Sequence, residues 1–175
     1  ASVLNAAGDA VDEVEFMMGD EIYYLQSDDL GDVTTADFMP GGKYDGSLYA
    51  VRMNNGVVRD VQVASAANLN RYAELTADGL GAGAFRVITS NNNERLTVTG
   101  AALANFAYAA DAVKCYEAVF EGNVLDTFRS VSTSAVDNGD YVRAWDLSDD
   151  YAGVAVVMVL IDKADVAAAT AYGII

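Results

Sequence analysis

The stretch YVRAWDLSDDYAGVAVVMVLI (residues 141–161) holds two strand-like segments joined by an acidic loop, and it decides the fold class. The second segment, Val154–Ile161, has eight apolar residues in a row and lacks the alternation of a strand with one face in water. It must be covered on both faces, either as a central strand of the chain's own fold or by another subunit. The apolar C-terminal residues 171–175 could likewise be covered by the chain's own fold or by another subunit. The candidate assembly residues are Val154, Val156, Val157, Val159, Ile161, Ile174 and Ile175.

Segments rich in β-branched and aromatic residues recur along the whole chain, separated by Gly, Asn and Asp clusters that favour turns. They span residues 21–26, 47–53, 57–64, 84–90, 94–100, 113–120, 140–147 and 153–161. This pattern predicts a mainly β protein of the sandwich or barrel type. Four Ala-rich stretches are candidates for short helices, with loop or strand as the alternative. These stretches are residues 2–14, 64–75, 99–112 and 162–173.

Residues 48–64 (LYAVRMNNGVVRDVQVA) read as a hairpin with two candidate registers. A two-residue loop at Asn55 and Gly56 sets Arg52 opposite Arg59, a like-charge pair. A three-residue loop that includes Asn54 shifts the register and brings Arg52 near Asp60. We predict the second register, with Arg59 as a misfit. Its apolar face comprises Tyr49, Val51, Met53, Val57, Val61 and Val63.

The two hairpins belong to a degenerate repeat of about ninety residues. Identical residues recur 92 positions apart (116 − 24 = 92) at Tyr24 and Tyr116, Thr35 and Thr127, Asp45 and Asp137, and Tyr49 and Tyr141. We predict two tandem β-sandwich or barrel-like halves, residues 1–90 and 91–175, joined near 89–93, with one continuous domain as the alternative. The second half would then lack strands. The N-terminal segment, a following domain or another copy would supply them.

The charge balance excludes several classes of partner. The chain of 175 residues has 26 acidic and 10 basic residues, a formal net charge of −16. Such a surface repels nucleic acid and anionic membranes, and the longest apolar run is far shorter than the ~20 residues of a membrane helix. We predict no nucleic-acid binding and no membrane insertion. The start, ASVLNAAG, is typical of a secreted protein after removal of its signal peptide, although an internal fragment would look the same.

The residues that carry most enzyme chemistry are scarce. Histidine is absent and Cys115 is the single cysteine, so neither a disulfide within the chain nor a Ser-His or Cys-His pair can form. We expect Cys115 to be a small buried hydrophobic residue, with Lys114 on the opposite strand face. Glycoside hydrolysis needs two carboxylates fixed ~5–10 Å apart across a cleft, and no spacing indicates such a pair. We therefore predict no catalytic residues.

Acidic turns and aromatic residues are the remaining candidates for ligand binding. The turns at 27–32, 137–140 and 146–150 offer the oxygen ligands that Ca²⁺ prefers, but none has the spaced pattern of a calcium loop, and a solvated turn is the alternative. The candidate ligands are Asp28, Asp29, Asp32, Asp137, Asp140, Asp149 and Asp150. Apart from calcium, we predict no cofactor. Trp145 with Tyr23, Tyr24, Tyr49, Tyr141 and Tyr151 could form a platform for sugars, or these could be half-buried sheet residues.

A strand, an acidic turn, a Thr/Ser segment and a Tyr-led hairpin recur over residues 16–64 and 108–161. This order, with Y-V-x-A-x-D at 141–146 before a valine-rich strand, resembles the β-rich modules of bacterial surface-layer and other extracellular cell-wall proteins. The resemblance implies assembly or display and carries over no catalytic residue.

We predict a non-enzymatic extracellular structural protein whose copies assemble into a surface layer or filament through strand or hydrophobic-face contacts, with cell-wall or glycan contact as a further expectation. A virion component (tail tube or capsid), a carbohydrate-binding module and a carboxylate-dependent hydrolase are the alternatives.

Overall fold

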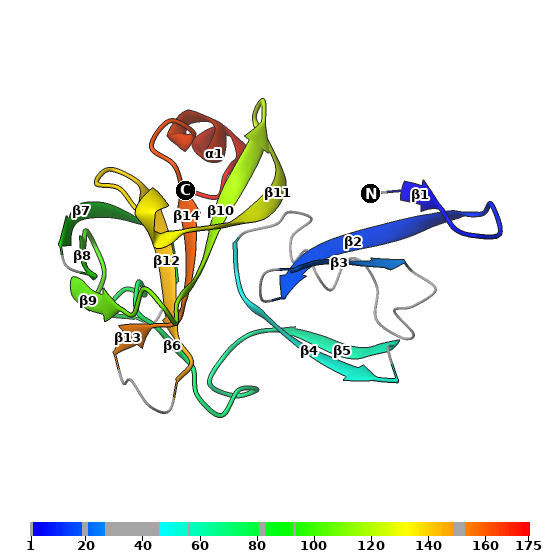
Figure 1. Ribbon diagram of the computed structural model, residues 1–175, viewed down its shortest axis with the longest axis horizontal. Coiled ribbons are helices and arrows are strands. Elements are labelled where there is room, and N and C mark those ends of the chain that lie inside the picture. The colour runs from blue at the N-terminus through cyan, green and yellow to red at the C-terminus, as the bar shows by residue number, and fades with distance from the viewer. Residues whose placement is uncertain are drawn as a thin grey trace. The chain divides into compact units, whose positions relative to one another are not determined.

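The computed structural model describes residues 2–18, 21–26, 46–55, 57–80, 83–92, 94–148 and 153–175. The protein is mainly β, as predicted. It divides into two compact units, residues 1–69 and residues 70–175 (Figure 1). This division differs from the predicted joint near residues 89–93. The strands on either side of residue 93 pair with each other, so the second unit is continuous through the predicted joint.

Unit 1 is built from two antiparallel ribbons. The strands β1 (Ser2–Leu4), β2 (Ala10–Met18) and β3 (Glu21–Gln26) form a sheet in that order, and β4 (Tyr49–Asn54) pairs with β5 (Val57–Val63). The Ala-rich stretch 2–14, a candidate helix, is β1 and the start of β2. The Asn5 Oδ1 atom accepts hydrogen bonds from the backbone N–H groups of Ala7 and Asp9, and Gly8 has φ +87°. These features fold the chain into a turn instead of a helix.

In the β4–β5 ribbon Arg52 lies beside Asp60, as predicted, but the predicted three-residue loop is wrong and the strands join as in the other candidate register. Asn54 pairs with Val57, so two residues separate the strands, and Asn55 has the positive φ (52°) that Asn tolerates. The register then shifts between Arg52 and Met53, so Arg59 is the extra residue of a bulge. The shift sets Val58 opposite Met53, the place that the prediction gave to Val57.

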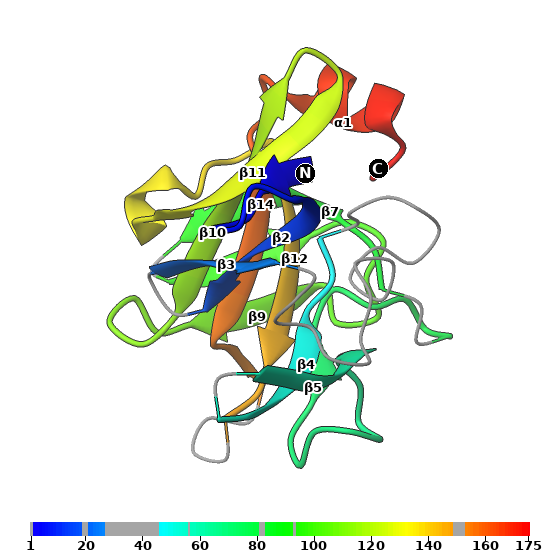
Figure 2. The ribbon, with the colours of Figure 1, turned by 90° about the vertical axis from the view of Figure 1, so that its right-hand side faces the viewer.

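Unit 2 holds a nine-stranded sheet and a C-terminal helix (Figures 1 and 2). The sheet has the order β11-β10-β14-β12-β7-β8-β9-β13, with β6 paired to β12. Its strands are β6 (Ala73–Glu74), β7 (Arg86–Asn92), β8 (Arg95–Val98), β9 (Asn105–Tyr108), β10 (Lys114–Glu121), β11 (Val124–Val131), β12 (Tyr141–Asp146), β13 (Val154–Ala155) and β14 (Val157–Ile161). A 3₁₀ turn, Thr133–Ala135, follows β11.

The apolar run Val154–Ile161 is a central strand of the chain's own sheet. Its second part, β14, pairs antiparallel with β12, as a hairpin requires, and parallel with β10 on its other edge (Figure 2). Its first part, β13, turns away at Val156 and pairs in parallel with β9. The chain therefore supplies neighbours to both edges of β14, the first of the two explanations that the missing alternation allowed.

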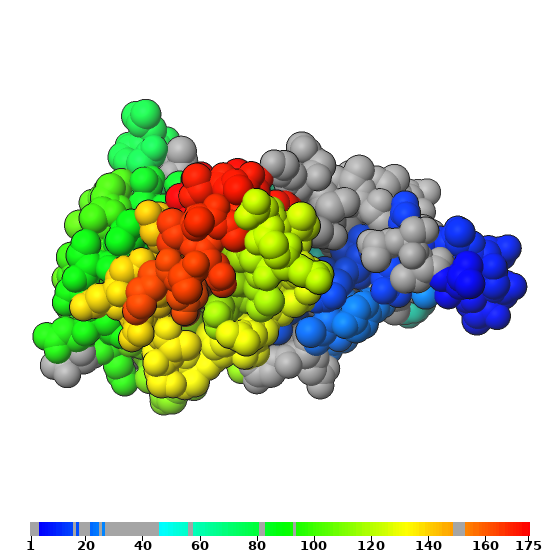
Figure 3. Space-filling view, turned by 90° about the horizontal axis from the view of Figure 1, so that it is seen from above, coloured from blue at the N-terminus to red at the C-terminus, as the bar shows by residue number. Residues whose placement is uncertain are grey.

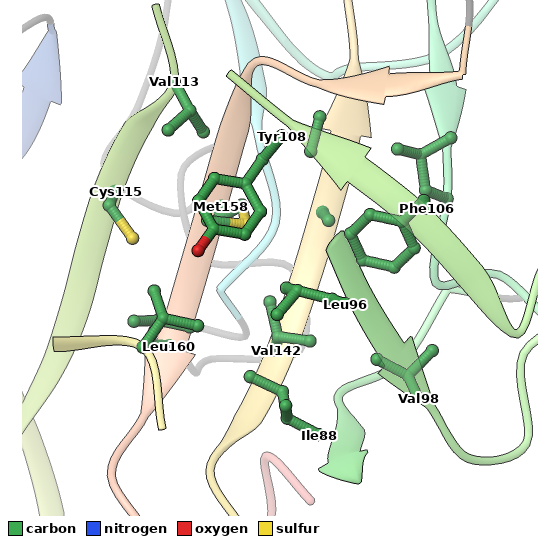
Figure 4. Packing of buried hydrophobic residues seen from close by; sticks show 14 residues of the cluster. Ile88, Leu96, Val98, Phe106, Tyr108, Val113, Cys115, Val142, Met158 and Leu160 are labelled. Carbon is green, nitrogen blue, oxygen red and sulfur yellow. The ribbon is translucent and has the colours of Figure 1, made fainter. Parts of the chain in front are cut away.

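The hydrophobic core of unit 2 lies against one face of β12 and β14. Met158 and Leu160 of β14 and Val142 of β12 lie opposite Leu96 and Phe106 of β8 and β9 (Figure 4). The cluster comprises Leu75, Ile88, Leu96, Val98, Phe106, Tyr108, Val113, Cys115, Val136, Val142, Ala144, Ala155, Met158 and Leu160. Val159 and Ile161, which alternate with these residues along β14, are buried too. Both faces of β14 are thus covered, as its composition demands.

One of the four candidate helices forms within the described residues. It is α1 (Val166–Tyr172), which ends at Gly173 in the left-handed conformation (φ 89°). Tyr172 makes an edge-to-face contact with Phe120 at the end of β10, and Figure 3 shows α1 beside the β10–β11 hairpin. The stretches 64–75 and 99–112 are turns followed by the short strands β6 and β9. Side-chain bonds around Ser65 and Asn68 hold the first, and Gly100 (φ 70°) interrupts the second.

Candidate functional site

The DNGD turn (137–140) uses its carboxylates to hold the fold together. The buried Asp140 accepts hydrogen bonds from the backbone N–H groups of Asp137, at 2.9 Å, and Lys163, at 3.1 Å. Asp137 accepts a hydrogen bond from Lys163 Nζ at 3.2 Å, which raises the pKa of that lysine. Each of these two candidate calcium ligands already has a donor from the protein. The carboxylates of the turn therefore bind the turn itself and Lys163, in the segment that follows β14.

The other predicted calcium ligands, Asp28, Asp29, Asp32, Asp149 and Asp150, lie outside the described residues. Within the third acidic turn, the buried Asp146 accepts hydrogen bonds from the backbone N–H groups of Ser148 and Gly153, at 3.0 and 2.6 Å. In the part of the chain that the structure describes, no group of three or more Asp, Glu, Cys or His residues could hold a metal ion. The described carboxylates of these turns act as turn-closing acceptors.

A buried ion pair that the sequence did not reveal joins β6 to β12. Arg143 Nε lies 2.8 Å from Glu74 Oε1, and Arg143 Nη2 lies 3.1 Å from Oε2, in a two-bond arrangement. The side chains are only 10% and 7% exposed. The guanidinium also lies over the ring of Trp145, at 5.1 Å from its centroid, and over Phe85 at 6.0 Å. The sequence signal for this pair was an arginine among apolar strand residues. Many exposed arginines have the same sequence context, so the signal does not distinguish a buried ion pair.

Small polar groups complete this cluster. Tyr72 Oη lies 3.4 Å from Glu74 Oε2 and accepts a hydrogen bond from Trp145 Nε1 at 3.3 Å. Burial raises the pKa of Tyr72. Thr76 Oγ1 donates to Glu74 Oε1 and accepts from the Ala144 backbone N–H. Every charged and polar group named here has a partner inside the fold, so the cluster fixes the segment around β6 on the sheet and presents no reactive group.

The aromatic platform considered as an alternative for Trp145 does not form around it, because that side chain is fully buried. Tyr23, Tyr49 and Tyr141 are half-buried, Tyr24 is exposed, and Tyr151 lies outside the described residues. Cys115 is buried in the hydrophobic core, and burial raises the pKa of its thiol to about 12. Its neighbour Lys114 is exposed on the other face of β10. The thiol therefore has no reactive setting, as the sequence predicted.

The predicted assembly residues differ in burial. Val159 and Ile161 are buried, and Val154, Val156, Val157 and Ile174 are half-buried, while Ile175 is exposed. The residues of β14 are held by neighbouring strands of the same chain, so they are not free to contact another molecule. The exposed large apolar side chains of unit 1 are instead Leu4, Ile22, Tyr24, Met53 and Val63.

The two units also differ in how their outermost strands are protected. In unit 2, β11 is the end of the sheet order, and its register against β10 shifts so that Asp126 is an extra, bulged residue. That bulge and the exposed Arg129 are devices that discourage further strand pairing. In unit 1, β3 pairs with β2 without any shift and ends its sheet within the described residues. We predicted missing strands in the second half, but the open edge belongs to the first unit.

Comparisons with known proteins leave the function to be argued from this geometry. No protein-family model matches the chain, and neither a curated protein nor a solved structure matches it. Among the described residues, no helix is both long enough and apolar enough to span a membrane.

Proposed function

We propose that this chain is a non-enzymatic structural protein of an extracellular surface, and that its copies assemble into a layer or filament. The observation that carries the proposal is the exposure of Ile22 and Tyr24 on β3, a strand that pairs with β2 without a bulge and ends its sheet within the described residues. Unit 2, in contrast, uses its own strands to cover its most apolar segment. A surface of exposed apolar strand residues favours association with another sheet.

The charged groups of the described core support the same proposal. Glu74, Arg143, Asp140 and Asp146 are the buried or nearly buried charges, and each accepts or donates hydrogen bonds within the fold. A general acid or base needs a carboxyl or amine that can reach a substrate, and these groups are committed to structural bonds. The site that remains available is therefore an apolar strand surface and not a reactive cleft.

We also propose that the two halves are diverged copies of one β unit. Tyr49 and Tyr141, which lie 92 residues apart (141 − 49 = 92), each begin a strand of six residues, β4 and β12. Each strand pairs antiparallel with an apolar strand that follows it, β5 or β14. The copies differ in context, because β12 lies inside a nine-stranded sheet and β4 pairs with β5 in a two-stranded ribbon.

Light scattering and electron microscopy of the purified chain test the assembly proposal. We expect the mean particle size to grow with protein concentration and regular particles to appear in the images. The series is run in NaCl, in MgCl₂ and in CaCl₂ at matched ionic strength. Growth in all three salts indicates relief of charge repulsion, and growth only in CaCl₂ indicates a calcium-dependent contact. A strict monomer at every concentration and in all three salts would refute the proposal.

A further inference from the structure

The outer edge of β3 is the most open strand edge that the structure describes. In the three-stranded sheet of unit 1, β2 and β3 pair over six residue pairs with no bulge, and the sheet order ends at β3 (Figure 1). After Glu21, the strand has no charged residue and no proline. Natural proteins usually protect such an edge with a bulge, a lysine or a proline. The edge strand β11 of the same chain has a bulge and two exposed charged residues, so the contrast lies within one molecule.

The exposed side chains of β3 form a self-complementary pattern. Ile22 is 41% exposed and Tyr24 is 57% exposed, and because they are two residues apart they lie on the same face of the strand. A twofold axis perpendicular to a sheet maps each face onto itself, so an antiparallel pair of identical strands sets residues of the same face opposite each other. If the twofold axis passes through residue 23, Ile22 of each copy lies opposite Tyr24 of the other copy, which gives two such pairs.

We propose that β3 pairs antiparallel with β3 of a second copy of this chain in this register, which joins two three-stranded sheets into one. This inference rests on the proposed self-assembly and names the edge and the partner. Met17 of β2 lies beside Ile22, so the two copies together place six apolar side chains on one face. Aromatic and β-branched residues opposite each other are favourable cross-strand pairs. The second copy is the occupant that this pattern matches, because β3 supplies both members of each Ile22–Tyr24 pair.

The negative charge of the protein opposes this contact but does not prevent it. Residues 1–69 contain 12 acidic and three basic residues, a net charge of −9 (3 − 12). Glu15 lies beside Tyr24 on the apolar face, and in the joined sheet the two copies of Glu15 are three strand spacings apart, about 14 Å. That distance exceeds the screening length of about 8 Å at physiological salt. The net charge of −9 on each unit 1 still repels the other copy at low salt, so association should strengthen as the NaCl concentration rises.

Sedimentation velocity of charge-insertion variants tests the edge. Ile22→Lys places a charge on the open edge of β3, and Val124→Lys is the matched control, because Val124 is 60% exposed on the protected edge strand β11. We expect the wild-type chain and Val124→Lys to dimerise with similar dissociation constants. Ile22→Lys should weaken dimerisation by about tenfold or more, since each dimer loses two apolar pairs. Far-ultraviolet circular dichroism checks that each variant is folded, and emission of the buried Trp145 reports on unit 2 alone.

Disulfide trapping tests the register without relying on a destabilised variant. Residues opposite each other in an antiparallel pair have Cβ atoms about 5 Å apart, close enough for a disulfide. An oxidised mixture of Ile22→Cys and Tyr24→Cys chains should give several times more covalent dimer than either chain alone. The native Cys115 does not interfere, because it is buried in unit 2.

The outcomes separate the inference from the proposed function. If the wild-type chain associates but Ile22→Lys and Val124→Lys associate equally well, or if the mixed cysteine chains do not cross-link preferentially, the β3 contact is refuted and self-assembly stands. If the wild-type chain remains a monomer at every protein and salt concentration, both fail. Loss of association in Ile22→Lys alone, with the preferred 22–24 cross-link, supports the contact.

Discussion

Replacing Glu74 by Gln removes the anion from the buried ion pair and leaves the rest of the cluster in place. Glutamine has nearly the shape of glutamate, so Tyr72 and Thr76 retain an oxygen or nitrogen within reach. The Arg143 guanidinium, only 10% exposed, then loses the Glu74 carboxylate, which offsets part of the cost of its burial. It also keeps its place over the Trp145 ring. The substitution therefore tests whether this charge pair holds β6 and β12 together.

The expected loss follows from the geometry. The pair makes two charge-assisted hydrogen bonds, at 2.8 and 3.1 Å, and both side chains are at least nine-tenths buried. Removing one partner of a buried pair costs about 3–5 kcal/mol, because the remaining charge stays desolvated. With a denaturant slope of about 2 kcal/mol per molar urea, this loss lowers the midpoint of urea unfolding by about 2 M. Such a loss is a large fraction of the stability of a typical domain.

Urea unfolding followed by the emission of Trp145 measures this loss, because the single tryptophan is buried beside the pair. The matched control is Glu117→Gln. Glu117, 13% exposed, accepts three hydrogen bonds from Arg129 at 3.0 to 3.1 Å, but the arginine that its replacement would leave is 63% exposed. An exposed pair contributes about 0–1 kcal/mol. If Glu74→Gln and Glu117→Gln lower the free energy of unfolding equally, burial does not set the strength of the pair and the reasoning is wrong.

Three further predictions concern unit 2. The Cys115 thiol, whose pKa is raised to about 12, binds its proton more tightly in the folded chain than in the unfolded chain. The free energy of unfolding should therefore fall by up to about 4 kcal/mol between pH 9 and pH 12. Urea titrations across this pH range measure the fall, and Cys115→Ala should make it smaller. Asp140→Asn should lower the free energy of unfolding by about 1–3 kcal/mol, because Asp140 is the buried acceptor of two backbone N–H groups. Asp137→Asn should lower it by less than about 1 kcal/mol, because the Asp137–Lys163 pair is exposed. Equal losses would contradict the role of the buried acceptor. Tyr72→Phe should cost about 1 kcal/mol and shift the emission of Trp145, and an unchanged spectrum would show that the bond to the indole is not formed.

The strands could be predicted because their signals are local. Each of the eight predicted strand segments contains a strand, since β-branched and aromatic residues bounded by turn-forming residues favour the extended backbone. The strands β1, β2, β6, β9 and β11 were missed. The sequence of β2 (AVDEVEFMM) is rich in acidic and Met residues, and β1, β6 and β9 are only two to four residues long, so they form because a neighbouring strand pairs with them. Tertiary pairing thus overrides a weak local preference. In β11 (VLDTFRSV) the β-branched and aromatic residues are a local strand signal that the prediction did not use.

The partners of each strand could not be predicted, because pairing is not local. The hairpin of β12 and β14 follows from the sequence, but the parallel pairing of β14 with β10 joins residues more than forty positions apart. The Arg143–Glu74 pair spans 69 positions and has no counterpart in the sequence pattern. The register of β4 and β5 shows the same limit on a small scale. Arg52 lies near Asp60, as predicted, but the predicted three-residue loop was wrong and the bulge at Arg59 was not foreseen.

The most apolar strand of a chain is a poor guide to where that chain binds its neighbours. β14 is so apolar because its own fold pairs both of its edges and buries most of its residues. Of the buried hydrophobic residues among the described side chains, four belong to unit 1 (Val11, Val14, Val58 and Ala64) and 21 to unit 2. A two-stranded ribbon is only marginally stable in water without further packing. On the described residues, this difference supports the proposal that unit 1 is the unit that contacts a neighbouring molecule. Its contact surface is best sought on a half-apolar edge strand such as β3, where the alternation of exposed and covered residues leaves Ile22 and Tyr24 free to meet a partner.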